Sequence, residues 1–331
     1  MKFFRIITDR HYQKWPSWDI VYEWEDELSV SLDIPIANSP TKDNPLYRIF
    51  LLLNNKIFKG KINNLSRKNY RIDPIYSIYF EMHPKDYKNF SNSKWTIPII
   101  IDFWKKSNIE LFLRLYFNCP YLLITSLEAL TFLQENQSNN KLVHFPISLP
   151  SIYKLESTQV VEKKYDIILP GRINRILFEY LKQYEKDHPD IEYLYQVQKD
   201  GELFYRSNKN RLIGKFHSRK KYMNLIQSAK IAFYATPGID GGEKRTNGFN
   251  PVTPRFLELL SAGCHIVARY PKNADTDFFQ LETICPSITS YDKFKERMNI
   301  VLHTAPPILK NEEYLRHHYT SKRVEILKRL L

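Results

Sequence analysis

Short apolar runs alternate with amphipathic stretches along most of the chain, and this rhythm is typical of an α/β protein. Strands that alternate with helices indicate a parallel sheet. The segment 47–53 fits either a strand or a buried helix, and Ser126 is a suitable N-cap for the helix after it. In the first half we predict strands at 3–8, 75–82, 97–101, 121–125 and 141–145, and helices at 23–32, 111–117 and 126–134.

The second half repeats this rhythm after Pro146–Pro150 and a polar stretch that reads as a linker. Of the nine glycines only Gly60 lies in the first half, and four crowd into 238–248. Glycine lets the backbone turn sharply or approach a ligand, so we expect the ligand-binding loops in the second half. We predict strands at 165–169, 192–196, 231–235 and 264–268, and helices at 176–187, 218–229, 254–262, 291–303 and 311–331.

A chain of 331 residues is long enough for two domains, and 43% hydrophobic with 26% charged residues describes a globular protein. The net charge of +13 suits nucleic acid, anionic lipid or a phosphorylated substrate. No nucleic-acid-binding motif accompanies it, and the basic residues are scattered. We therefore favour anionic lipid headgroups and lipid-diphosphate acceptors, and expect no nucleic-acid partner.

The three cysteines have no metal-binding spacing and do not pair evenly, which favours free thiols in a reducing cytoplasm. The N-terminal segment reads as a strand and not as a signal peptide. No apolar run approaches the ~18 residues needed to span a bilayer. We expect a cytoplasmic protein whose contact with the inner face of the membrane is peripheral.

The most informative segment begins at Thr253, where threonine and proline suit a helix start. Arg255 and Glu258 lie three residues apart, so they share one helix face. Free amides at a helix N-terminus and an arginine form an anion site, and a carboxylate one turn further accepts hydrogen bonds from sugar hydroxyls. This predicts a sugar-nucleotide pocket; a structural Arg255–Glu258 salt bridge is the alternative.

The segment Thr253–Gly263 resembles the donor-site helix of GT-B glycosyltransferases, in particular the "glycosyl transferases group 1" and CgeB-like branch, whose pattern is roughly T-x-R-x-F/L-E-x-L-A-x-G. The resemblance implies that Glu258 holds the ribose and that basic groups hold the diphosphate. Many retaining members carry a second glutamate eight positions earlier, where this chain has Asn250. The stereochemical outcome therefore stays open.

The resemblance also implies an architecture and an activity. We expect a GT-B fold of two Rossmann-like domains facing a cleft: an acceptor domain at 1–155, a donor domain at 156–312 and a terminal helix at 313–331. The activity would be metal-independent and cofactor-free. It would transfer a sugar from a nucleotide-diphosphate donor to a hydroxyl of a glycan or lipid-linked glycan, in bacterial surface polysaccharide synthesis.

Three further sets of candidates carry weaker signals. Gly171, Arg172 and Arg175 follow the strand at 165–169, where ligands bind in α/β sheets, although a solvated turn fits as well. The composition of the loop 238–248 indicates either a mobile lid or a plain surface loop. Asp102 follows a buried strand and is a candidate general base if the enzyme inverts; a helix cap or a partner for Lys105 is the alternative.

Candidates for acceptor binding are His11, Asp19 and Glu23, after the first strand. We expect no metal site, because His317-His318 has no carboxylate or cysteine beside it to complete a set of ligands, and Asp275-Thr276-Asp277 lies in a predicted loop. Two rival functions stay open besides nucleic-acid binding driven by charge. Residues 252–255 resemble the V-T-E-K stretch of α1,3-fucosyltransferases, which use GDP-fucose, and the fold also suits a non-catalytic nucleotide-sugar-binding protein.

Overall fold

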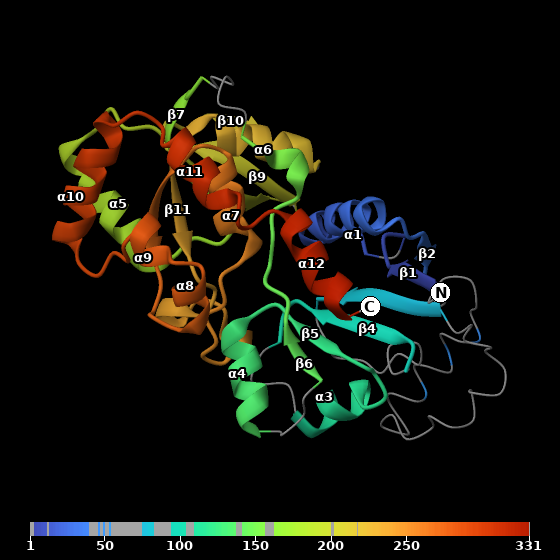
Figure 1. The fold of residues 1–331 in the computed structure, drawn as a ribbon. Coiled ribbons are helices and arrows are strands. Elements are labelled where there is room, and N and C mark those ends of the chain that lie inside the picture. Colours follow the sequence, from blue (N-terminus) through green and yellow to red (C-terminus); the bar gives the residue numbers. More distant parts are fainter. Residues whose placement is uncertain are drawn as a thin grey trace. The chain divides into compact units, whose positions relative to one another are not determined.

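The computed structural model divides into two compact units, Met1–Ile147 with Thr320–Leu331 (unit 1) and Ser148–Tyr319 (unit 2), both visible in Figure 1. Most of the segment 47–53 lies outside the described residues. The structure describes residues 3–11, 13–39, 46, 49, 53, 75–82, 94–103, 109–136, 141–155, 162–199, 202–216 and 218–330.

Unit 1 is built on a six-stranded parallel sheet with the order β2-β1-β3-β4-β5-β6. Its inner strands are buried apolar runs, as expected where helices cover a parallel sheet. The parallel register brings the carboxyl ends of all six strands to one edge. The strands are β1 Phe3–Thr8, β2 Ile36–Asn38, β3 Ile75–Glu81, β4 Thr96–Ile100, β5 Leu122–Ile124 and β6 Leu142–His144.

The helices of unit 1 confirm most of the predicted pattern. Ser126 caps its helix as expected, because its Oγ accepts a hydrogen bond from the Ala129 amide at 3.1 Å. The first long helix begins at Asp19, four residues before the predicted start, directly after a short 3₁₀ turn that opens with Pro16. The elements are η1 Pro16–Trp18, α1 Asp19–Leu32, α3 Ile109–Tyr116, α4 Leu127–Asn136 and α12 Thr320–Leu330.

Unit 2 carries the sheet β10-β9-β8-β7-β11-β12, in which the last four strands are parallel. Strands β9 and β10 add an antiparallel edge that the sequence pattern did not predict. The elements are η3 Ser151–Tyr153, β7 Tyr165–Leu169, α5 Arg175–Asp187, β8 Tyr193–Lys199, β9 Glu202–Ser207, β10 Leu212–Gly214, α6 Arg219–Gln227, β11 Ala229–Ala235, η4 Ile239–Gly241, η5 Lys244–Thr246, α7 Pro254–Ser261, β12 His265–Arg269, α8 Ala274–Phe278, α9 Leu281–Ile284, α10 Tyr291–His303 and α11 Ile308–Leu315.

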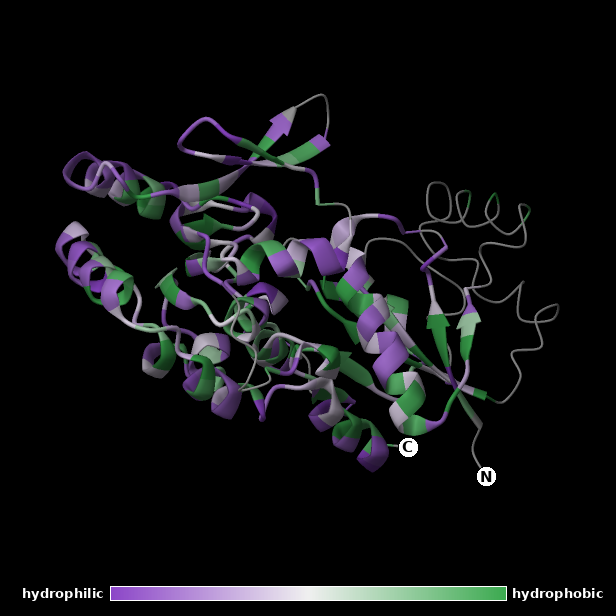
Figure 2. Ribbon diagram, turned by 90° about the horizontal axis from the view of Figure 1, so that it is seen from above, coloured by the Kyte–Doolittle hydropathy of each residue, from purple (hydrophilic) through white to green (hydrophobic). Residues whose placement is uncertain are grey.

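Helices cover both faces of the sheet of unit 2 (Figure 1). Helices α5 and α10 bury Leu181 and Phe294 against Ile167 and Phe233 of the strands, while α6, α7 and α11 pack together on the other face. Figure 2 shows the central strands mostly green and the helices partly purple, so the apolar sides of the helices supply the core.

The predicted helix at 311–331 is wrong in one respect, because the chain forms two helices there, α11 and α12. Between them Tyr319 bridges Leu149, whose amide donates to the His318 carbonyl at 2.9 Å. In unit 1, Arg323 on α12 donates to the carbonyls of Pro146 and Ile147. Among the described residues, no helix has the length and apolar character needed to cross a membrane.

Candidate functional site

The turn after β7 meets the start of α7 at Gly171 and Arg255. Gly171 has a φ of +72°, and a Cβ on it would lie 2.5 Å from Arg255 Nη2 and 2.7 Å from Cζ. Only glycine adopts this φ without strain and leaves room for the guanidinium. The two residues that the sequence marked separately therefore form one contact at the carboxyl end of the sheet, where α/β proteins bind ligands.

Helix α7 starts as predicted, with Thr253 at the N-cap and Pro254 in the first turn. The Thr253 side chain makes no capping hydrogen bond, and its amide donates to the Tyr234 hydroxyl at 3.1 Å. The first turn therefore keeps its positive end free of a capping side chain. Arg255 adds a full cation to that end of the helix.

Arg255 is a partly buried cation that lies close to the Tyr222 hydroxyl on α6. Its Nε is buried without a hydrogen-bond partner among the residues the structure describes, and none of the ion pairs found there includes Arg255. The carboxylate of Glu258 acts on Arg255 electrostatically but forms its ion pair with Arg219, and a buried cation without a close anion is costly. The arrangement therefore favours an anionic ligand.

Glu258 shares the helix face with Arg255, but its ion-pair partner is Arg219 at the start of α6. Arg219 Nη2 lies 2.7 Å from Glu258 Oε1, and the carboxylate side chain is only 6% exposed. The Arg219 guanidinium also lies over the rings of Tyr153 and Tyr222, at 5.4 Å and 5.9 Å. No spacing pattern predicted Arg219, because 39 positions separate it from Glu258.

Arg172 and Arg175 have separate surroundings. Arg172 is half-exposed and pairs with Glu243 at 2.7 Å. Hydrogen bonds from Arg245 and the nearby Arg172 lower the pKa of Glu243 to about 2. Arg175 is exposed, and its ion-pair partner is Glu179 of the same helix, at 3.5 Å. Through its ion pair with Glu243, Arg172 contacts the loop that precedes α7.

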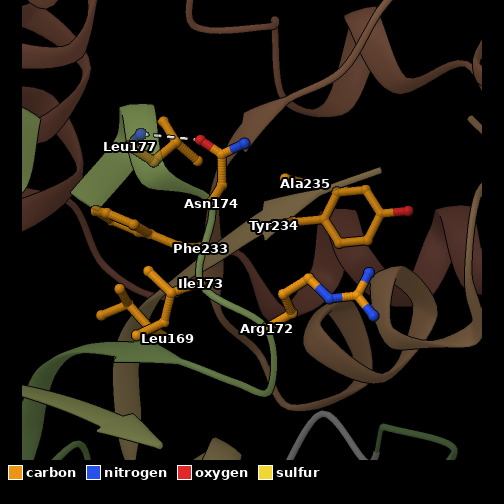
Figure 3. Close-up of a pocket in the computed structure, with 8 residues that line it drawn as sticks. All are labelled: Leu169, Arg172, Ile173, Asn174, Leu177, Phe233, Tyr234 and Ala235. Atoms are coloured by element: carbon orange, nitrogen blue, oxygen red, sulfur yellow. Dashed lines mark hydrogen bonds between the residues drawn. The ribbon is translucent and has the colours of Figure 1, made fainter. Parts of the chain in front are cut away.

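A small hollow opens between the carboxyl ends of β7 and β11 (Figure 3). The Asn174 side chain caps α5 there by accepting from the Leu177 amide at 3.0 Å. In Figure 3, Arg172 and Tyr234 project away from the apolar side chains. The Tyr234 hydroxyl accepts from the Thr253 amide, so one lining residue of the hollow contacts the start of α7. The lining residues are Leu169, Arg172, Ile173, Asn174, Leu177, Phe233, Tyr234 and Ala235.

The glycine-rich loop before α7 is held by specific contacts. Asp240 accepts from Arg269 at 2.5 and 2.8 Å and from Asn174 at 2.9 Å. The buried Asn250, which replaces the glutamate of the pattern that Thr253–Gly263 resembles, accepts from Thr236 Oγ1 at 3.0 Å. These bonds hold the loop in one conformation. The side-chain oxygen of Asn250 is used in a structural hydrogen bond.

The candidate residues of unit 1 lie after β1 and β4. His11 is exposed, Asp19 opens α1 and Glu23 is partly buried on that helix. Asp102 is partly buried, and its amide donates to the Met82 carbonyl at 3.0 Å. All four thus lie on the side of the sheet where strands β1 and β4 end.

The sequence pattern missed a buried carboxylate in this unit, Glu25, which is 1% exposed. It accepts from Thr8 Oγ1 at 2.6 Å and from Arg10 Nη2 at 3.1 Å. Burial raises its pKa to about 7, against the two hydrogen bonds, which lower it. Glu25 therefore ties the turn after β1 to α1.

Glu25 makes the stability of the protein depend on pH in a defined direction. The pKa of Glu25 in the folded state is raised from 4.5 to about 7. Its contribution to the free energy of unfolding is therefore fully present below pH 4.5 and is lost as pH rises through 7. Relative to a Glu25→Gln variant, the parent should lose at most about 3 kcal/mol between pH 4.5 and 8. Melting temperatures of both proteins across this range test it; parallel curves would contradict it.

The described residues contain no group of three or more His, Cys, Asp or Glu side chains placed to hold a metal ion. Asp275, in the stretch with the D-x-D letters, is buried in the short helix α8, so the predicted loop is a helical turn. Its neighbour Thr276 forms a capping box with Asn273.

No protein-family model and no curated protein sequence matches the chain. The structure is similar to a putative UDP-N-acetylglucosamine 2-epimerase from Listeria monocytogenes, with a TM-score of 0.55 and 10% identity over 99% of this chain and 95% of that one. A TarM variant of S. aureus, solved with fondaparinux, α-GlcNAc-glycerol and UDP, gives 0.53 and 10% over 77% and 55%.

The pneumococcal O-GlcNAc transferase GtfA, solved with UDP and GlcNAc, is also similar, with a TM-score of 0.47 and 10% identity over 77% of this chain and 56% of that chain. The chain thus spans little more than half the length of either transferase. At this identity the similarity shows the fold alone. The fold is GT-B, with two α/β units on mostly parallel sheets, as the resemblance of the donor helix predicted.

Proposed function

We propose that the protein is a glycosyltransferase that moves a sugar from a nucleotide-diphosphate donor to a hydroxyl of a glycan or lipid-linked glycan. The observation that carries this proposal is the Arg255 guanidinium, held against Gly171 at the start of α7 with no carboxylate in an ion pair among the described residues. The pattern of Thr253–Gly263 supports a relation to the group 1 and CgeB-like enzymes.

Each donor-site residue has a role in this proposal. Arg255, Arg172 and the α7 amides neutralise the diphosphate as the bond to the sugar breaks. Gly171 lets the guanidinium and the ligand approach the backbone, and Thr253 places the first amides of the helix. Glu258 accepts hydrogen bonds from the ribose. Arg175 acts on the diphosphate only through the field of its charge.

The acceptor side is assigned to unit 1. Asp102 is proposed as the general base of an inverting reaction, since a carboxylate can deprotonate the attacking hydroxyl. His11, Asp19 and Glu23 are proposed to contact the acceptor. The net charge of +13 favours work at the inner face of a bacterial membrane, on anionic lipid-linked glycans of surface polysaccharide synthesis.

The test is a calorimetric and thermal-shift screen of UDP, GDP, CMP and their sugars, followed by product analysis, because a ligand of the native state raises its melting temperature. Transfer or slow release of the sugar supports the proposal, and turnover of GDP-fucose alone identifies the fucosyltransferase alternative. Tight binding without turnover identifies a binding protein. Epimerised donor without release identifies an epimerase, the second candidate that the whole-chain similarity to the Listeria protein suggests.

We predict that chelation leaves transfer unchanged. In this proposal Arg255 and the α7 amides neutralise the diphosphate charge that a metal ion neutralises in other transferases. Initial rates with about 5–10 mM EDTA should match those without it. This concentration exceeds that of trace metal by at least about an order of magnitude. Loss of activity that Mn²⁺ or Mg²⁺ restores would show that a metal holds the diphosphate instead.

A further inference from the structure

The Tyr205 side chain on β9 is 3% exposed, and its hydroxyl is buried with no hydrogen-bond partner among the described residues. A buried hydroxyl without a partner destabilises a fold, so such groups are rare unless a ligand completes them. Burial raises the pKa of Tyr205 well above its usual value, so the group keeps its proton at neutral pH. The hydroxyl is therefore a hydrogen-bond donor that the protein does not use.

The surroundings of this hydroxyl are those of the donor site. The Gly171 amide lies near the Tyr205 oxygen without meeting the distance and angle of a hydrogen bond, and Tyr222, Arg255 and Glu258 act on it electrostatically. The Tyr205 ring packs edge-on against Phe216 at 5.6 Å between centroids, which limits its rotation. The unused O–H is thus positioned beside the contact between Gly171 and Arg255.

The cluster offers donors and a positive charge to an incoming ligand. Arg255 Nε and the Tyr205 O–H both have unused protons among the described groups, and Arg255 lies in the first turn of α7, whose amides have no capping side chain. The nearby carboxylate of Glu258 is paired with Arg219 at 2.7 Å, which offsets its repulsion of an incoming anion. A phosphate group, which accepts several hydrogen bonds at once, fits this chemistry.

We propose that the Tyr205 hydroxyl donates to a phosphate oxygen of the nucleoside diphosphate that Arg255 neutralises, and that it raises the preference of the site for diphosphate over nucleoside. This inference rests on the proposed function. It assigns a ligand contact to the antiparallel strand β9. It also accounts for a buried hydroxyl that contributes nothing to the ligand-free fold.

Tyr205→Phe tests this contact because it removes the hydroxyl and keeps the ring. Calorimetry with UDP, GDP and inorganic pyrophosphate should show about tenfold weaker binding than the parent, as expected for a hydrogen bond to a charged group. Uridine and guanosine should bind equally to both proteins. Without ligand, the variant should melt at the same temperature as the parent or higher, because it loses an unpaired polar group.

Tyr184→Phe is the matched control. The Tyr184 hydroxyl donates to Asn299 Oδ1 at 2.7 Å, so its loss should lower the melting temperature and leave nucleotide affinity unchanged. The inference is overturned if Tyr205→Phe binds diphosphates like the parent, loses nucleoside affinity equally, or melts at a lower temperature. If the parent itself binds no nucleotide and no pyrophosphate, the proposed function fails and the inference fails with it.

Discussion

Arg255→Ala should weaken the binding of UDP or GDP by about 2–4 kcal/mol, while uridine and guanosine bind as they do to the parent. The reason is that the lost guanidinium is the cation against Gly171, and no carboxylate forms an ion pair with it among the described residues. Calorimetric titration of the four ligands measures this difference directly. It corresponds to roughly 30- to 1,000-fold in the dissociation constant.

Arg211→Ala is the matched control for charge. Arg211 belongs to the same unit, is 59% exposed and pairs with Glu192 at 2.6 Å, so its removal changes net charge without touching the site. Gly171→Ala checks the same contact from the other side, because its Cβ would displace the Arg255 guanidinium. Equal diphosphate affinity of Arg255→Ala and the parent would sink the assignment of the donor site.

Much of the α/β rhythm was predictable from the sequence, because buried strands are short apolar runs bounded by turn residues. Strands β7, β11 and β12 and helix α7 lie within one or two residues of their predicted positions. Strand β9 was missed, since half of its residues from Glu202 onward are polar and form no continuous apolar run. The break before Thr320 was missed because no glycine or proline marks it; pairing with Leu149 creates it.

The residues of the candidate donor site also fall into those that the sequence predicted and those that it did not. Arg255, Glu258 and Gly171 were predictable because each follows from a local pattern: a helix start, a helical spacing, and a turn after a strand. Arg219 and Tyr205 were not, since they reach the site from α6 and from strand β9. A contact between residues far apart in the sequence depends on the packing of the elements, which one sequence does not encode in its spacing.

Glu258→Gln should abolish the discrimination between UDP and 2′-deoxy-UDP. Glu258 lies one helical turn beyond Arg255, roughly 5 Å along the axis, which is close to the step from phosphate to ribose. A carboxylate accepts from both ribose hydroxyls, and each such bond to a charged group strengthens binding by about 1.5–3 kcal/mol. The parent should therefore prefer UDP about tenfold or more, and Glu258→Gln should show almost no preference.

The ion pair with Arg219 adds a second effect to this substitution. Removing one partner of a buried pair leaves the other charge uncompensated, so Glu258→Gln should also lower the unfolding free energy by about 3 kcal/mol. Arg219→Gln breaks the same pair but keeps the carboxylate, and the double variant should be less destabilised than the sum of the two single ones. If Glu258 binds ribose, Arg219→Gln keeps a preference for UDP that Glu258→Gln has lost. Equal preference in the parent and both variants, with the stability loss intact, would show that Glu258 is a structural partner of Arg219 alone.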